Sequence, residues 1–307
     1  MTINTDLLVN NKNLLAFSAG VDSTALFFIL LEQKINFDIA IVNYNTREQS
    51  NDEVTYAQEL ASTYNKKCHI KQAKLSTSNF EKNARDTRYT FFEQLIEEYN
   101  YTNLITAHQL NDKLEWFLMQ FTKGAGLVEL AGLQDITCKG HYTLIRPILD
   151  YSKEELLEYL KTNNIKYFID ESNFDNIYKR NYFRKNFSDK LLNEFQEGIK
   201  RSFTYINKDS ISLNKQNDAL IIIEELEIFK SSNDDNMNIR IIDKSLKQRG
   251  YILSSAQRDE VLNQKEIVIN NFSISITNSS SPHSFTRCRT LALFLFALFP
   301  LSLNISA

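Results

Sequence analysis

Glycine, proline and cysteine are all scarce in this chain of 307 residues, which has 7 Gly, 3 Pro and 3 Cys. The three cysteines, Cys68, Cys138 and Cys288, are far apart, and the sequence has no Cys-x-x-Cys pair. Neither a zinc ribbon nor a cysteine-held iron–sulfur site is therefore indicated. An odd, dispersed set of cysteines is typical of a reducing compartment, so we expect a cytoplasmic protein.

Neither sign of charge dominates, because 35 Lys and Arg stand against 38 Asp and Glu, a formal net charge of −3. The whole chain is therefore not marked as a nucleic-acid binder, although a local basic face is compatible with this balance. A composition of 43% hydrophobic and 24% charged residues is that of an ordinary globular protein, and the length predicts two domains. The polar N-terminus indicates no signal peptide, and we expect no membrane partner.

Strand-like and helix-like segments alternate through the first ~190 residues. Strands are expected at 14–17, 37–44, 67–74, 103–107 and 143–146, and helices at 24–33, 51–64, 79–99, 111–121 and 153–163. This order predicts a doubly wound α/β domain in which helices cover both faces of a mostly parallel, five-stranded sheet. Ligands of such sheets bind beyond the carboxyl ends of the strands.

The pattern changes after this region. Residues 191–211 and 238–249 look helical, and 220–229 looks strand-like. We expect a first domain over 1–195, a linker over 196–215 and a smaller, mainly helical and incomplete domain for tRNA recognition over 216–270.

The last segment, 271–307, differs in composition from the rest. The sequence has no acidic residue after Glu266 and no lysine after Lys265, and Ser-rich sequence leads into an apolar run at 291–303. That run is broken by Pro300 and is shorter than the ~20 residues of a bilayer span. One interpretation is a membrane or partner anchor. The interpretation we prefer is the out-of-frame end of a truncated gene, which a reading-frame check on the nucleotide sequence would test.

The segment Ser18-Ala-Gly-Val-Asp-Ser23 joins the first predicted strand to the first predicted helix. Backbone N–H groups of such a turn, together with the helix dipole, form a cradle for an anion. No Gly-Lys-Ser/Thr follows, so the turn is not a Walker A loop, and Gly-x-Gly-x-x-Gly is absent. From spacing alone, a phosphate site and a plain capped helix start are equally supported.

His108, Asp112 and Glu115 form a second group at the same predicted sheet edge. Their spacing of i, i+4 and i+7 puts them on one face of a helix that starts early. A His with two carboxylates can hold a phosphate or Mg²⁺ and transfer protons. The alternative is a solvated helix start with an incidental His.

Several further motifs follow in order, and together they carry a resemblance. They are Asn83–Tyr89 (Asn-Ala-Arg-Asp-Thr-Arg-Tyr), Lys123–Gly126, Arg146–Leu149, Asp170–Asn173 and Tyr178–Arg184. With the turn at Ser18, this ordered set resembles the bacterial tRNA(Ile)-lysidine synthase family, a branch of the PP-loop ATP pyrophosphatases. The resemblance covers about residues 12–190. Ala19 stands where the family has a glycine, and Tyr44 where it has a histidine.

The resemblance implies a fold and a reaction. The fold is that of the adenine nucleotide α-hydrolases. In the reaction, ATP activates the C2 oxygen of the wobble cytidine in tRNA(Ile) with a CAU anticodon, and free L-lysine then displaces AMP. Two alternatives stay open: a thiolase-type PP-loop enzyme, which would need close cysteines, and a non-catalytic nucleotide- or tRNA-binding relic. A homodimer is a further open hypothesis.

The resemblance also implies residue roles. The residues expected to bind ATP are Ser18, Ala19, Gly20, Val21, Asp22, Ser23 and Arg88. Mg²⁺ would bridge Asp22 to the polyphosphate, with Asp112 as a second ligand. His108 would stabilise the α-phosphate, and Asp112 and Glu115 would contact metal or the lysine ammonium, so the catalytic set is Asp22, His108, Asp112 and Glu115.

The tRNA would meet a basic cluster in which aromatic residues alternate with cations. Its expected contacts are Lys179, Arg180, Asn181 and Arg184, beside Tyr182 and Phe183. Arg146, at the end of a strand, is expected to face the site.

Overall fold

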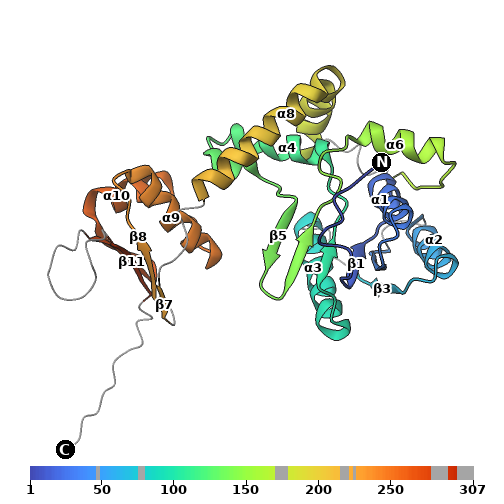
Figure 1. Cartoon of the computed structure of the whole chain (residues 1–307), viewed down its shortest axis with the longest axis horizontal. Helices are drawn as coiled ribbons and strands as arrows, with labels where there is room; N and C mark the ends of the chain where they lie inside the picture. The colour runs from blue at the N-terminus through green and yellow to red at the C-terminus, as the bar shows by residue number, and fades with distance from the viewer. Residues whose placement is uncertain are drawn as a thin grey trace, which may run out of the picture. The chain divides into compact units, whose positions relative to one another are not determined.

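The computed structural model describes residues 1–45, 49–74, 80–169, 179–214, 221–223, 226–277 and 290–295. The chain divides into two compact units, Met1–Asn207 and Lys208–Ala307 (Figure 1). The border falls within the segment 196–215 that the sequence marks as a linker, but helix α8 (Asp189–Asn214) runs through it.

The first unit is built on a six-stranded sheet in the order β3-β2-β1-β4-β6-β5. Five strands are parallel and match the five predicted ones: β1 (Asn13–Ala16), β2 (Phe37–Asn43), β3 (Cys68–Gln72), β4 (Asn103–Ile105) and β6 (Tyr142–Ile145). The sixth strand, β5 (Ile136–Lys139), pairs antiparallel with β6 at the edge. It was not predicted because three of its four residues are exposed, so it carries no apolar run.

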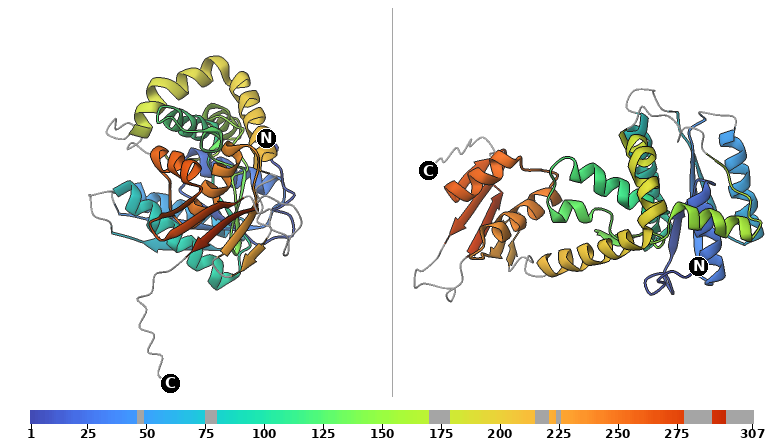
Figure 2. Two further views of the ribbon diagram at one scale, coloured as in Figure 1. Left: turned by 90° about the vertical axis from the view of Figure 1, so that its left-hand side faces the viewer. Right: turned by 90° about the horizontal axis from the view of Figure 1, so that it is seen from above.

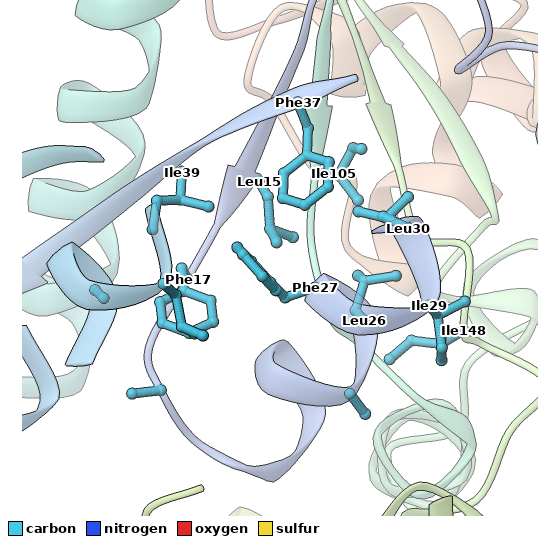
Figure 3. Close-up of a cluster of buried hydrophobic side chains, with 14 of the residues drawn as sticks. Leu15, Phe17, Leu26, Phe27, Ile29, Leu30, Phe37, Ile39, Ile105 and Ile148 are labelled. Carbon is cyan, nitrogen blue, oxygen red and sulfur yellow. The ribbon is translucent and has the colours of Figure 1, made fainter. Parts of the chain in front are cut away.

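Both faces of this sheet are buried, which is why its strands read as apolar runs rather than alternating ones. Helices α1 (Val21–Glu32), α2 (Gln49–Thr63) and α6 (Lys153–Thr162) contribute to the core that contains Leu15, Ile39 and Ile105 (Figure 3). Helix α3 (Phe80–Tyr99) covers the opposite face, where it packs on the neighbouring residues Leu14 and Leu104.

The order of the strands places a binding edge next to β1. The chain moves outward from β1 to β2 and β3, then returns to the other side of β1 with β4. Beyond the carboxyl ends of β1 and β4 the strand order reverses, and ligands of open α/β sheets bind at such a switch point.

A helical layer follows the sheet in the same unit. It contains α4 (Leu110–Phe121), α5 (Leu127–Ala131), α7 (Lys179–Phe183), the π-helical turn η2 (Arg184–Ser188) and the first part of α8. Leu110 and Leu114 of α4 pack against Leu192 and Phe203 of α8. The apolar contact fixes the helix that bears Asp112 and Glu115 relative to the segment 179–188.

The second unit combines helices with a sheet. Helices α9 (Asp235–Gln248) and α10 (Ser255–Gln264) lie against a sheet (Figure 2). Ile242 and Val261 of these helices pack with Phe272 and Ile274 of β10. The antiparallel sheet has the order β7-β8-β11-β10-β9. Its strands are β7 (Ile221–Ile223), β8 (Leu226–Lys230), β9 (Glu266–Ile269), β10 (Phe272–Thr277) and β11 (Thr290–Leu295).

The second unit, Lys208–Ala307, extends beyond the predicted bounds of 216–270. The helix expected at 238–249 is there as α9, but the expected end at residue 270 leaves out two strands, β10 and β11. Residues 272–277 and 290–295, which composition set apart as an aberrant tail, lie in the sheet. The rest of the tail lies outside the described residues, and the frameshift stays a hypothesis. None of the described helices is long and apolar enough to cross a membrane.

Candidate active site

The turn after β1 is held by its two serines. The Ser18 N–H donates to Ser23 Oγ at 3.2 Å, the two hydroxyls lie 3.1 Å apart, and Ser23 Oγ donates to the Gly20 carbonyl. Gly20 is the N-cap of α1, so the first N–H groups of the helix point into the turn. A β-carbon at Gly20 would lie 3.5 Å from Ser18 Oγ. The turn therefore presents helix N–H groups and two hydroxyls, and its role as an anion cradle stays a prediction.

Ala19 adopts the backbone conformation that glycine favours. Its φ is 59° and its methyl is fully buried in the core on the α1 side. Its carbonyl accepts a hydrogen bond of 2.9 Å from the Phe168 N–H, and Gly20 forms an isolated parallel bridge with Phe168. The segment around Phe168 therefore lies against the turn and holds its strained residue in place.

Asp22, in the first turn of α1, has a buried oxygen with no partner among the described residues. That atom is Oδ1. Burial and the charge of Asp112 raise the pKa of Asp22 to about 7, while the charges of Lys153 and Arg184 lower it. A carboxylate that is desolvated and not hydrogen-bonded is suited to a cation.

A cavity of about 350 Å³ opens on this turn at the carboxyl ends of the strands. It brings together seven of the residues predicted for the site: Ser18, Gly20, Val21, Asp22, Ser23, Arg88 and His108. Ala19 is not in its lining, because its methyl points into the core. Val42, Tyr44, Tyr89 and Phe92 give the cavity an apolar and aromatic side.

Helix α3 presents one face to the cavity. Arg85, Arg88, Tyr89 and Phe92 all line it, and their spacing is that of a single helix face. The Tyr44 hydroxyl donates to the Ala84 carbonyl at 2.8 Å and so joins the end of β2 to this helix. The tyrosine thus helps to position the two arginines.

His108 lies between β4 and α4 and also faces the cavity. Its Nδ1 is 3.0 Å from Thr106 Oγ1. Burial lowers the pKa of His108, an effect that Asp112 opposes and Arg146 strengthens. The imidazole is therefore neutral at neutral pH and can accept or donate a hydrogen bond without carrying charge. Because α4 starts after His108, the histidine does not share a helix face with Asp112 and Glu115 as the spacing had suggested.

Asp112 and Glu115 are not in the cavity lining; they form a four-residue ion cluster with Arg180 and Arg184. Arg180 Nε donates to Glu115 Oε2 at 2.8 Å, and Arg184 Nε donates to Glu115 Oε1 at 2.5 Å. Arg180 Nη2 also donates to Asp112 Oδ1, and Asp112 Oδ2 accepts the Gln109 N–H. The cluster joins two residues predicted for catalysis to two predicted for tRNA.

The cluster balances two buried negative charges with two positive ones. The Glu115 side chain is 1% exposed and that of Arg184 is 19% exposed, whereas Arg180 is 44% exposed. Burial alone would raise the pKa of Asp112, but the Arg180 guanidinium and the hydrogen bond from the Gln109 N–H hold it below its ordinary value. Burial raises the pKa of Glu115 against the opposing effect of Arg184. Arg180 is the most exposed member of the cluster.

Two positions differ from expectation. Lys153, at the first position of α6, lines the cavity and was not predicted. A lysine at a helix N-terminus is unfavourable with respect to the helix dipole, which is a signal of function that the sequence did offer. Arg146 was expected to face the site, but its Nη1 donates to the Gln134 carbonyl at 2.6 Å and to Thr137 Oγ1 at 3.1 Å, beside β5.

Other predicted residues lie at or beyond the edge of the described segments. The Asp170–Asn173 motif and Tyr178 lie outside the described residues, and Lys179 is described by its backbone alone. Asn181 lies in α7 beside the ion cluster.

A protein-family model matches the part of the chain that contains this site. The model of the PP-loop domain matches residues 2–191, which include the turn, the cavity and the ion cluster. A curated tRNA(Ile)-lysidine synthase of Helicobacter hepaticus is 46% identical over 283 residues, which cover 81% of this chain and 67% of that protein. The chain belongs to the tRNA(Ile)-lysidine synthase family.

Other members of the family are similar over comparable lengths. The tRNA(Ile)-lysidine synthase of Campylobacter jejuni is 46% identical over 261 residues, 83% of this chain and 78% of that protein. The synthase of Mesoplasma florum is 34% identical over 73% of this chain and 57% of its own length. The expected family is therefore confirmed.

A solved structure supports the fold. The U34-tRNA thiolase NcsA of Methanococcus maripaludis, with its [4Fe-4S] cluster, aligns with a TM-score of 0.56 over 67% of this chain and 75% of its own. At 18% identity this likeness confirms the PP-loop architecture and says nothing of thiolation.

Proposed function

We propose that this lysidine synthase family member ligates free lysine to the wobble cytidine of CAU-anticodon tRNA(Ile) at the cavity beyond β1 and β4. The cytidine C2 oxygen attacks the α-phosphate of ATP and pyrophosphate leaves. The lysine ε-nitrogen then attacks C2, AMP leaves, and the nitrogen loses its extra protons. The observation that carries the proposal is the convergence of the anion cradle, Asp22, His108 and Arg88 on one cavity.

The nucleotide would bind with its pyrophosphate end in the turn. Ser18, Gly20, Val21 and Ser23 supply hydroxyl and N–H donors, and Ala19 sets the path of the backbone. Arg88 supplies positive charge from α3. Val42 and the aromatic side of the cavity suit the adenine base.

The donor set at Asp22 fits Mg²⁺. Its unpartnered buried oxygen is a hard ligand, and a bridging cation would remove the repulsion between this carboxylate and polyphosphate. No three His, Cys, Asp or Glu residues cluster as a metal cage within the described segments, so phosphate oxygens and water would complete the shell. Asp112 fits less well, because both of its oxygens are engaged.

The lysine ammonium would enter at the ion cluster. Arg180 is the more exposed guanidinium, and tRNA phosphates would draw it away from Asp112. The freed carboxylate, with Glu115, would then receive the ammonium. Lys179, Asn181 and Arg184 would complete the contact with tRNA. This exchange makes lysine binding depend on the RNA.

Exchange of labelled pyrophosphate into ATP tests the first half of the reaction. With the isoleucine CAU transcript and no lysine, the wild-type protein should catalyse exchange, because adenylation is reversible. Asp22→Asn should lose it. Exchange without any tRNA, or none with the transcript, would contradict the proposal. A homodimer and a cytoplasmic location stay hypotheses, which sedimentation and cell fractionation would test.

A further inference from the structure

Three aromatic side chains of the segment 179–188, which also carries the ion-paired arginines, form a cluster. The ring centroids of Tyr182, Phe183 and Phe187 are 5.7 to 5.9 Å apart. Tyr182 is 50% exposed and Phe187 is 41% exposed. An exposed group of large rings is uncommon on a protein surface without a binding role.

The π-helical turn creates this cluster. The Asp189 N–H donates to the Arg184 carbonyl five residues back, which is the π pattern, and single π turns occur mostly at functional sites. The wider turn lets Tyr182 and Phe187, five residues apart, meet as an edge-to-face pair at 66°. Ser188 Oγ donates to the Phe183 carbonyl at 3.1 Å, and Asn186 donates to the Tyr182 carbonyl at 2.9 Å. The platform is therefore held in one shape before any ligand arrives.

The charges around the rings favour RNA over an apolar protein surface. Lys185 and Lys190 are exposed on the same stretch of chain. The nearby acid, Asp189, accepts a hydrogen bond of 2.8 Å from Asn111. Arg180 and Arg184 are paired with Asp112 and Glu115, so the exposed rings and ammonium groups are what the segment offers to RNA before any exchange at the ion cluster. Rings stack bases and ammonium groups contact the neighbouring phosphates.

We infer that Tyr182, Phe183 and Phe187 form a stacking platform for an unpaired base of the RNA anticodon loop, and that Lys185 contacts an adjacent phosphate. The inference rests on the proposed function, because the tRNA loop must reach the ion cluster, and Arg180 lies in the same five-residue helix as Tyr182. Stacking one loop base here would present the wobble cytidine to the cavity.

Binding of a CAU anticodon stem–loop RNA by the full chain tests the inference. The probe carries 2-aminopurine in place of the anticodon adenine, and affinity and fluorescence are both measured. The double variant Tyr182→Leu/Phe187→Leu keeps apolar bulk but removes the rings, so affinity should fall about ten-fold or more. Tyr182→Phe/Phe187→Tyr keeps both rings and should bind like the wild type. Lys185→Gln should lower the slope of log affinity against log salt by about 0.7.

The RNA affinities of the variants either support or contradict the stacking platform. The platform is supported when the leucine variant loses affinity, the ring-swapped variant keeps it, and binding of Mg·ATP is equal in all. Equal RNA affinity of the leucine variant and the wild type would overturn it, and so would equal loss in both double variants, since that would show a contact other than stacking. Failure of the proposed function looks different: the wild type would then bind the RNA through the rings but give no pyrophosphate exchange.

Discussion

Residue 19 combines a backbone strain with a buried methyl, and the two effects oppose each other. An L-residue in the left-handed region costs about 1–2 kcal/mol, whereas the buried methyl of Ala19 contributes about 0.8 kcal/mol. The strain therefore outweighs the packing of the methyl group. A glycine at this position would relax the turn at a small loss of packing.

We predict that Ala19→Gly is at least as stable as the wild type, with a rise of up to about 1 kcal/mol in the free energy of unfolding. The matched control is Ala25→Gly in α1, where the residue is equally buried but helical. That variant should lose about 1 kcal/mol or more. Urea denaturation measures both, and equal destabilisation of the two would show that Ala19 is not strained.

Asp22 should make stability depend on pH in a defined direction. The folded-state pKa of Asp22, about 7, lies above the ordinary value of 3.8. The stability that comes from the protonated side chain is therefore fully present below pH 3.8 and is lost as the pH rises through about 7. Asp22→Asn removes the charge and keeps the shape. The variant should therefore unfold at a higher temperature than the wild type at pH 8.5, and the difference should be clearly smaller at pH 5.

Thermal unfolding at the two pH values checks this prediction. Ser23→Ala is the control, because it changes the same turn without changing an ionisable group. Its difference from the wild type should be the same at both pH values. A pH-independent difference for Asp22→Asn would show that the carboxylate is charged throughout.

Among the elements, the contact between α4 and the segment 179–188 depends on charges that are far apart in sequence. Removing one partner of a buried pair leaves the other uncompensated, at a cost of about 3 kcal/mol. Arg184→Gln should approach that loss, since Glu115 is almost completely buried, although Arg180 still contacts it.

A double-mutant cycle measures the coupling. Glu115→Gln/Arg184→Gln should lose less stability than the sum of the single variants, with a coupling of about 1–3 kcal/mol in urea denaturation. The exposed neighbour Lys185→Gln should change stability by less than about 0.5 kcal/mol. Additive single variants would mean that the two side chains do not stabilise each other.

The elements also show what the sequence could and could not predict. The five parallel strands were predicted because residues such as Leu14 and Leu15 are buried on opposite faces, so each strand is a short apolar run. β5, β9, β10 and β11 were missed: β5 is mostly exposed, and β10 alternates serine with isoleucine in a segment whose composition suggested a tail.

The candidate site also has one part that the sequence indicated and one part that it did not. The turn at Ser18 has a local signature, so it was singled out as a candidate anion cradle, although spacing alone supported a plain capped helix start equally well. The pairing of Arg180 with Asp112 and Glu115 depends on how α7 packs on α4, and no local spacing predicts that contact. The sequence therefore separated catalytic from tRNA-binding residues that the structure joins.

At the scale of the whole molecule, we propose that the first unit carries both steps of the reaction. It would hold ATP at the carboxyl edge of its sheet. The RNA would draw the Arg180 guanidinium out of the ion cluster, and the lysine ammonium would take its place. Activation and ligation are then two steps at adjoining sites of one unit. Lysine should bind well only when tRNA is present.

Ligation of labelled lysine to tRNA transcripts tests both steps together. The full chain is incubated with Mg·ATP, radiolabelled lysine and CAU-anticodon transcripts of either the isoleucine or the methionine tRNA. We predict label in the isoleucine transcript, none in the methionine transcript, and none with Asp22→Asn. Equal labelling of both transcripts, or no labelling by a folded protein that binds ATP and tRNA, would contradict the proposed reaction.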